Sequence, residues 1–251
     1  MPSRPLIILH SDPDCIAVEK PAGLATIPGR AETDSLIERL GRQVALPSSG
    51  TSDPRLRIVH RLDKDTSGVV LMAKHVAAQR ALSEQFQNNR VIKEYLAIVA
   101  GVPKQDEGDI DAPLAPHPTS PRHMAVSKHG RPARTLWRIE QRLGPLTLLR
   151  VFPKTGKTHQ IRVHIAHVGL PLAIDPLYNS RGPQALYLSQ FKRDYRASRE
   201  VKERPLIERL TLHAERLTFA HPTTGAETTV TCATPKDFRA TVNMLAKHAR
   251  R

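Results

Sequence analysis

IVHRLDKDTSGVVLMAK, residues 58–74, is the stretch that decides the fold class. Its first half is a polar loop carrying Asp63 and Asp65, and its second half, GVVLMAK, is an apolar run typical of a buried strand. A scaffold can hold a loop carboxylate firmly when the loop leads directly into such a strand. The same residue types also build ordinary turns. The loop is therefore a candidate catalytic site, with a simple turn as the alternative.

Short strands and helices surround this loop. Leu6–His10 and Cys15–Gly23 are strand candidates joined by a turn, and a helix is expected behind a cap at Asp34 or Ser35. Residues 48–55, SSGTSDPR, have the composition of a flexible loop. Further elements are expected in this order: a helix from His75 to Asn88-Asn89, strands between Val91 and Pro153, a helix over about Thr158–Val168, a strand pair over 210–233, and a helix from Pro235.

This order predicts an α+β fold with a mixed, largely antiparallel sheet and flanking helices, because strands adjacent in sequence dominate and helices are interspersed irregularly. Residues 181–209 are rich in Lys, Arg and Glu and are expected to form a solvated insertion loop. A length of 251 residues suits one large domain, or one domain of two lobes.

The charge distribution indicates a polyanionic partner. The chain has 38 Lys and Arg against 24 Asp and Glu. Between Arg122 and Arg162 there are ten basic residues and one acidic residue, Glu140. Nucleic acid is favoured over an acidic membrane, since no basic amphipathic helix with large apolar anchors is evident.

The cellular compartment is predicted from what the sequence lacks. No apolar run approaches the roughly 20 residues that span a bilayer, and the first residues do not form a secretory signal. Cys15 and Cys232 are far apart and have no spacing typical of a disulfide framework or a zinc site. A cytoplasmic protein with two structural cysteines is expected.

A second polar segment, KTGKTHQIR, combines a glycine turn with Lys154, Lys157, His159 and Arg162 at the start of the expected helix. Backbone N–H groups and cations together favour anions there. Phosphate or carboxylate binding and a merely basic helix face are equally good interpretations. His164 and His167 could share a helix face, but a zinc site would need further ligands at matching spacing.

Two further features have competing interpretations. Tyr95, in the strand candidate VIKEYLAIVAG, could be a core residue or a surface on which a nucleobase stacks. DTSG, residues 65–68, matches the short signature of aspartic proteases. A protease needs two such carboxylates sharing a proton, and the sequence has no second copy, so only a homodimer could supply it.

Taken together, these segments closely resemble the RluA-type pseudouridine synthases. HRLDKDTSG is similar to the family's HRLDxxTSG loop, KEYLA to its Lys-x-Tyr strand, and TGKTHQIRVH with GLPLAIDPLY to its third motif; LHAERLTFAHPTTGAE resembles the stretch that closes its catalytic domain. The resemblance implies the pseudouridine synthase fold with a central RNA-binding cleft. It also implies one catalytic domain over residues 1–251, without the separate amino-terminal RNA-binding domain that some members carry.

Residue roles follow from the resemblance. Asp63 matches the catalytic aspartate, Tyr95 the tyrosine that packs on the target base, and Arg162 the arginine that pairs with the aspartate. Arg61 matches the arginine that enters the RNA where the base has left, while Asp65 matches a variable position. The complete set that we assign to RNA binding is Arg61, His60, Thr66, Lys154, Lys157 and His159.

The implied activity is isomerisation of specific uridines in structured RNA, ribosomal or transfer, by a monomeric enzyme that needs no cofactor and no metal. The base must be flipped out of its stack, at a cost of a few kcal/mol. Asp63 could form an acylal-type adduct or assist a glycal route, and either Tyr95 or Asp63 through water could take the final proton. The alternative is a catalytically silent RNA-binding protein or ribosome assembly factor with the same fold.

Overall fold

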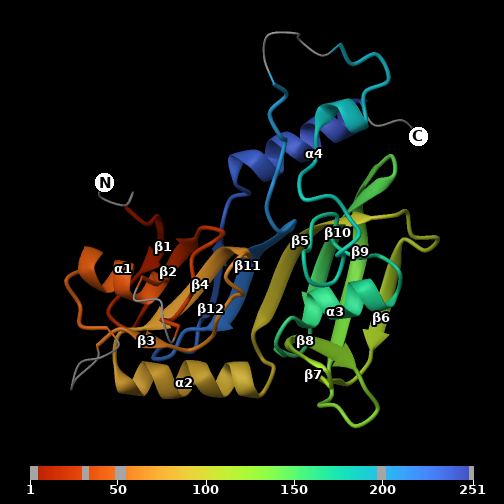
Figure 1. Cartoon of the computed structure of the whole chain (residues 1–251). Coiled ribbons are helices and arrows are strands. Elements are labelled where there is room, and N and C mark those ends of the chain that lie inside the picture. The colour runs from red at the N-terminus through yellow and green to blue at the C-terminus, as the bar shows by residue number, and fades with distance from the viewer. Residues whose placement is uncertain (1–4, 30–33, 49–54, 197–201, 249–251) are drawn as a thin grey trace. The chain divides into compact units, whose positions relative to one another are not determined.

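A computed structural model describes residues 5–29, 34–48, 55–196 and 202–248 (Figure 1). The chain divides into two compact units. The first comprises residues 1–93 and 214–233, and the second comprises residues 94–213 and 234–251. Each unit has its own group of paired strands and its own hydrophobic clusters, so each is described by itself.

The first unit is built on the strand order β1-β2-β4-β11. β1 (Ile8–Ser11) pairs antiparallel with β2 (Cys15–Lys20), and β2 pairs antiparallel with β4 (Ser67–Ala73). β12 (Glu227–Thr231) pairs with the part of β11 (Leu212–Ala220) that belongs to this unit, while the short β3 (Arg57–Ile58) pairs with the last residues of β4.

Two helices accompany this sheet. α1 (Leu36–Gln43) begins behind Ser35, whose hydroxyl accepts a hydrogen bond from the Glu38 backbone N–H. α2 (Val76–Gln87) places Ala78 and Leu82 against Val69 and Leu71 of β4. Because all seven residues of β4 are buried, this strand is a continuous apolar run rather than an alternating one.

The second unit is an antiparallel sheet in the order β5-β10-β9-β6. Its strands are β5 (Ile92–Ala100), β6 (Glu107–Asp111), β9 (Arg134–Leu143) and β10 (Leu146–Pro153). β7 (Leu114–His117) and β8 (Ser120–Val126) form a separate hairpin.

Helices cover both faces of this second sheet. α3 (Gln160–His167) packs Ile161 and Ile165 against one face, together with Val99 and Val151. α4 (Lys236–His248) packs Phe238 and Leu245 against the other, in a cluster with Ile98 and Leu148. The alternation of Leu148, Leu149 and Val151 along β10 divides the side chains between these two cores.

Most predicted elements are confirmed. The predicted cap Ser35 is the N-cap of α1, and α2 begins behind His75, the expected start of its helix, and ends at Asn88. The predicted loop over 48–55 lies mostly outside the described residues. In the predicted solvated insertion, the backbones of Leu186 and Ile207 pair and both side chains are 2% exposed, so the segment is anchored in the core at these two points. Leu188–Gln190 forms a short 3-10 helix between them.

Candidate active site

A buried lysine holds the backbone of the loop that carries Asp63. Lys20 is 0% exposed, and its ammonium donates hydrogen bonds to the carbonyls of Pro21, Leu24 and Lys64 at 3.0, 2.7 and 2.7 Å. The last of these carbonyls belongs to the residue directly after Asp63. A charge-assisted donor with three acceptors can satisfy a buried ammonium, and here it also ties the loop to the end of β2.

Other hydrogen bonds hold the loop on either side of Asp63. The hydroxyl of Thr26 donates to the carbonyl of Leu62 at 2.9 Å and accepts from the N–H of Leu62 at 3.2 Å. The backbone N–H of Thr66 donates to the carbonyl of Asp63, which closes a turn. The Asp63 side chain is half-buried, while Asp65 is exposed. The loop thus presents one carboxylate from a backbone fixed at both ends.

Gly68, the last residue of the motif, allows β4 to approach its neighbour closely. Its φ is +130°, a conformation that side chains rarely adopt. A Cβ at this position would lie 2.2 Å from the carbonyl oxygen of Ala214 in β11. A residue other than glycine would therefore push β4 and β11 apart at the point where the loop enters the sheet.

His60 precedes Asp63 in the loop and makes contacts within its own unit. Its Nε2 accepts a hydrogen bond from the Leu71 N–H at 2.9 Å, and its ring stacks on Phe86 with centroids 4.5 Å apart. Desolvation and, to a smaller extent, the charge of Lys93 lower the pKa of His60 to about 3. The imidazole is therefore neutral at physiological pH, so this residue acts here as a structural acceptor. Its RNA-binding role stays a prediction.

In the second unit, Tyr95 lies on β5 opposite Val151 of β10. Its side chain is half-buried and packs against the hydrophobic cluster that includes Ala97 and Ile161. Both interpretations of Tyr95 remain open, because one part of the ring contributes to the core and another part is accessible.

Arg162 is held by a partner that sequence reasoning did not select. Its Nε and Nη2 donate to the two carboxylate oxygens of Asp175 at 2.8 and 2.7 Å, and the side chains of the two residues are 7% and 0% exposed. Asp175 also accepts hydrogen bonds from the backbone N–H groups of Leu177 and Tyr178. This two-point ion pair fixes the plane and the direction of the guanidinium.

A tyrosine completes the surroundings of Arg162. The guanidinium carbon lies 5.1 Å from the ring centroid of Tyr178, within the range of a cation–π interaction. The Tyr178 hydroxyl accepts a hydrogen bond from the Met124 N–H at 2.8 Å and pairs with Nδ1 of His159 at 2.9 Å. The structure thus brings together Arg162 and His159, two of the predicted site residues, around Tyr178.

The predicted anion site before α3 is partly closed by the protein itself. Gln160 accepts hydrogen bonds from the Lys157 N–H and the Thr155 hydroxyl, and its amide donates to β9. His159 has a left-handed φ of 53° and gives no side-chain cap. Lys154 remains exposed and Lys157 half-exposed, so these two side chains are accessible to an anion.

His164 is not available as a ligand in this arrangement. Its Nδ1 pairs with the hydroxyl of Thr135 at 2.8 Å and its Nε2 with the carbonyl of Ala112 at 2.9 Å. His167, by contrast, is exposed. The two histidines therefore have different roles, although their spacing places them three residues apart on α3.

Several basic residues of the predicted RNA-binding stretch are already paired. Besides Arg162–Asp175, four ion pairs of this stretch are Arg134–Asp109, Arg142–Asp106, Arg150–Glu94 and Arg150–Glu140. Three of these four acids precede Arg122 in the sequence, and reach their partners through neighbouring strands. The positive field of this stretch is therefore smaller than its ten basic residues suggest.

The site residues thus form two frameworks, one in each unit. Asp63 depends on Lys20 and Thr26, and Arg162 depends on Asp175 and Tyr178. Sequence reasoning missed these supporting residues. The available signals were a lysine placed before the Pro-Ala-Gly turn at the end of a strand, and an acid within the segment GLPLAIDPLY.

The chain matches the family model described as RNA pseudouridylate synthase over residues 14–167. Among curated proteins it is similar to the ribosomal large subunit pseudouridine synthase D of Xanthomonas campestris pv. campestris, with 37% identity over 98% of this chain and 71% of the relative. The protein of the same name from Escherichia coli K12 is 36% identical over 93% of this chain and 68% of the relative.

Solved structures agree with this match. Human RNA pseudouridylate synthase domain containing 4 is 26% identical, with a TM-score of 0.70 over 95% of this chain and 92% of that one. The human domain-containing protein 1 of the same series, at 24% identity and a TM-score of 0.67 over 94% of this chain and 86% of that one, supports the fold.

The fold and the matched residues define an isomerase that acts on RNA. This chain belongs to the RNA pseudouridylate synthase family, and the predicted fold class is confirmed. The predicted enzyme class is confirmed as well, and the catalytically silent alternative has no support. None of the helices in the described part of the chain is long and apolar enough to cross a membrane.

Proposed function

We propose that this enzyme isomerises uridines of ribosomal RNA from the large subunit, with Asp63 as the catalytic carboxylate. The relatives named for large-subunit pseudouridine synthesis support this substrate, since they align with nearly the whole chain. The observation that carries the proposal is the loop around Asp63. Lys20 and Thr26 fix its backbone on both sides of a carboxylate that is half-buried. Catalytic groups need this kind of fixed support.

The reaction assigns a specific task to that carboxylate. The bond between C1′ of the ribose and N1 of uracil breaks, the base turns, a bond forms between C1′ and C5, and the proton on C5 is lost. A carboxylate can attack C1′ or stabilise positive charge there, as carboxylates do in glycoside cleavage. It can alternatively take the C2′ proton in a glycal route. Both tasks require an ionised and oriented Asp63.

The remaining assignments belong to the same proposal. Tyr95 stacks on the target base, Arg162 is the guanidinium that keeps the catalytic carboxylate ionised and oriented, and Arg61 fills the place of the flipped base. Stacking of a base on an aromatic ring contributes about 1–3 kcal/mol. Either Tyr95 or Asp63 through water takes the final proton.

Binding of the RNA is assigned to Lys154, Lys157, His159, Thr66 and His60. The exposed ammonium of Lys154 supports its assignment most directly. One catalytic domain formed by the whole chain, a monomeric state, a cytoplasmic location and transfer RNA as a further substrate are the other parts of the proposal. Size-exclusion chromatography with light scattering tests the monomer.

The function is tested with RNA that carries tritium at C5 of uridine. The wild-type enzyme is expected to release tritium from the RNA of large ribosomal subunits isolated from cells that lack the gene. Mapping of pseudouridine in the same RNA then identifies the position. No release from ribosomal RNA, together with release from transfer RNA, would move the substrate to transfer RNA. No release from either pool would overturn the proposed function.

A further inference from the structure

The turn between β1 and β2 holds a carboxylate in a fixed orientation outside the predicted active site. Oδ1 of Asp12 accepts hydrogen bonds from the backbone N–H groups of Asp14 and Cys15, both at 2.8 Å. These bonds occupy one oxygen and leave Oδ2 directed at neighbouring side chains. Although desolvation opposes it, the hydrogen bonds from Cys15 and His10 hold the pKa of Asp12 well below its usual range. The carboxylate is therefore an anion at neutral pH.

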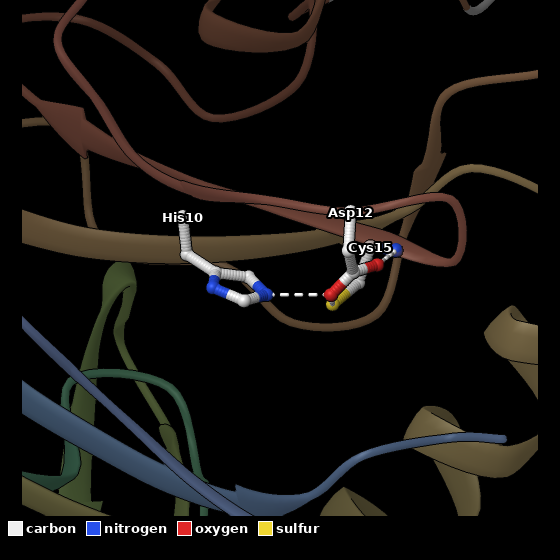
Figure 2. A group of neighbouring side chains, drawn as sticks. All are labelled: His10, Asp12 and Cys15. Atoms are coloured by element: carbon white, nitrogen blue, oxygen red, sulfur yellow. Dashed lines mark hydrogen bonds and ion pairs between the residues drawn. The ribbon is translucent and has the colours of Figure 1, made fainter. Parts of the chain in front are cut away.

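Three side chains surround this second oxygen. Nε2 of His10 lies 2.6 Å from Oδ2, Nε2 of His221 lies at 3.2 Å, and the sulfur of Cys15 lies at 3.4 Å. Figure 2 shows the His10 ring, on β1, turned toward the Asp12 carboxylate beside the Cys15 sulfur at the start of β2. A carboxylate, an imidazole and a thiol converging on one point form a donor set that binds transition metals.

The histidines around this turn differ in whether they can act as ligands. Nδ1 of His221 accepts hydrogen bonds from the backbone N–H groups of Thr223 and Thr224, so its proton is on Nε2. Nδ1 of His75 accepts from the Ala78 N–H in the same way, and its Nε2 pairs with Asp14. A ring nitrogen that carries a proton has no lone pair for a metal. His221 and His75 therefore serve the turn as hydrogen-bond donors.

His10 has no such constraint. Within the described part of the chain, its ring makes a hydrogen bond through Nε2 alone. The proton can therefore move to Nδ1 through solvent, because the His10 side chain is 30% exposed. Nε2 then presents its lone pair toward Asp12 and Cys15. His10 is the histidine of this group that can ligate a metal without loss of a backbone hydrogen bond.

We propose that Nε2 of His10, Oδ2 of Asp12 and Sγ of Cys15 form a binding site for a thiophilic divalent transition metal of the zinc class. The three atoms lie within 4.8 Å of one another. Tetrahedral zinc ligands at ordinary bond lengths lie roughly 3.3–3.6 Å apart. The distance from Cys15 to Asp12, 3.4 Å, already fits. The distance from His10 to Asp12 must open by roughly 0.7 Å, which a half-exposed side chain can provide.

Charge and protons balance in the binding step. Desolvation raises the pKa of the Cys15 thiol to about 12, so Cys15 is a thiol before the metal arrives. Binding forms the metal–sulfur bond and releases the thiol proton to solvent, while the His10 proton moves from Nε2 to Nδ1. One thiolate and one carboxylate then neutralise the divalent ion, and water completes the fourth position. Sulfur and imidazole ligands favour zinc over magnesium and calcium.

Cadmium binding to the full chain tests the site, because a cadmium–thiolate bond absorbs in the ultraviolet. The chelator-treated wild type is expected to bind one Cd²⁺ with this absorption band, and Zn²⁺ is expected to displace it. Cys15→Ser should remove the band. The matched control is Cys232→Ser: Cys232 is equally buried, and desolvation likewise raises its pKa to about 12. This control variant should keep the band.

A second pair of variants covers the case in which Cys15→Ser does not fold. His10→Gln changes a half-exposed side chain and should weaken Cd²⁺ binding by at least the roughly 10–100-fold that loss of an outer-shell partner costs. His75→Gln should leave the affinity unchanged, since Gln can still accept from the Ala78 N–H. Absence of the band in wild type, its persistence in Cys15→Ser, or equal affinity of His10→Gln and wild type would overturn the proposal. The cluster would then be a hydrogen-bonded turn only.

Discussion

The two units hold their candidate catalytic residues in different ways. In the first unit, Lys20 and Thr26 bind backbone carbonyls, so the position of Asp63 depends on the path of the loop. In the second unit, Asp175 binds the guanidinium of Arg162 itself, so the side chain is held directly. A loop residue can be supported through any backbone atom, but a long side chain on a helix needs a partner at its end. Loss of support should therefore affect the two units differently.

We expect the largest loss of activity from Asp63→Asn, which removes the proposed catalytic carboxylate of the first unit. Asparagine is nearly the same size but can neither attack C1′ nor act as an anion beside it. Tritium release should fall by roughly 10⁴-fold or more, the scale observed when a group that acts directly in the chemistry is removed. The RNA affinity and the thermal unfolding midpoint should stay near wild type.

Asp65→Asn is the matched control, since Asp65 is an exposed carboxylate of the same loop. Its release rate should equal that of wild type. Full activity of Asp63→Asn with loss of activity in Asp65→Asn would exchange the roles of the two residues.

Asp175→Asn tests whether Arg162, in the second unit, depends on its buried partner. The substitution leaves the buried guanidinium of Arg162 without its carboxylate, and removal of one partner of a buried pair typically costs about 3–5 kcal/mol. Misplacement of a positioned group by about 1 Å can reduce turnover by about 10²-fold. The free energy of unfolding, measured in urea, and the rate of tritium release should both fall.

The ion pair Arg134–Asp109 supplies the control for this variant. Both side chains are about half exposed, and exposed pairs contribute about 0–1 kcal/mol. Asp109→Asn should therefore unfold at nearly the same urea concentration as wild type. If Asp175→Asn behaves like Asp109→Asn in both assays, Arg162 does not depend on its buried partner.

Lys20→Met should have a smaller effect on turnover than on stability. The substitution removes the ammonium from the carbonyls of Pro21 and Leu24, while the carbonyl of Lys64 keeps the Gly23 N–H. A buried unsatisfied group costs about 1–3 kcal/mol. Because Thr26 still holds Leu62, the loop should shift rather than detach, and activity should fall by about tenfold. Lys104→Met, in an exposed loop of the second unit, is the control and should match wild type. Equal unfolding of the two variants would show that Lys20 does not anchor the loop.

Sequence reasoning located the residues with a chemical role better than the residues that support them. Asp63, Tyr95 and Arg162 lie in segments that resemble a family, so their roles could be predicted before their positions were known. Lys20 binds the loop through Lys64, and Asp175 binds Arg162 from the segment that follows α3; local residue patterns do not reveal either contact. The same limit explains why the sequence overstated the positive field of residues 122–162. Acids outside this range pair with arginines within it.

The elements themselves were predictable because local signals agreed with the tertiary contacts. Ser35 and His75 cap helices whose apolar residues are buried, and the apolar run of β4 is buried on both faces. The insertion was harder to predict. Its composition is that of a solvated loop, but Leu186 and Ile207 are drawn into the core by contacts with Leu96 and Phe238 that lie far away in sequence.

We expect the smallest effect on turnover from His60→Gln. This variant should instead change how the free energy of unfolding depends on pH. The pKa of His60 is lowered from the ordinary value of 6.5 to about 3, so the unfolded chain binds a proton that the folded chain excludes. Its contribution to stability is complete above about pH 6.5 and is lost as the pH falls toward 3.

His60→Gln keeps an acceptor for the Leu71 N–H but does not titrate. The free energy of unfolding of wild type, measured in urea between about pH 4 and pH 8, should therefore fall more steeply with acid than that of His60→Gln. The difference can reach about 1.4 kcal/mol per pH unit. His129→Gln, at an exposed site of the second unit, should follow the wild-type curve. Parallel curves for wild type and His60→Gln would mean that His60 protonates freely in the folded protein.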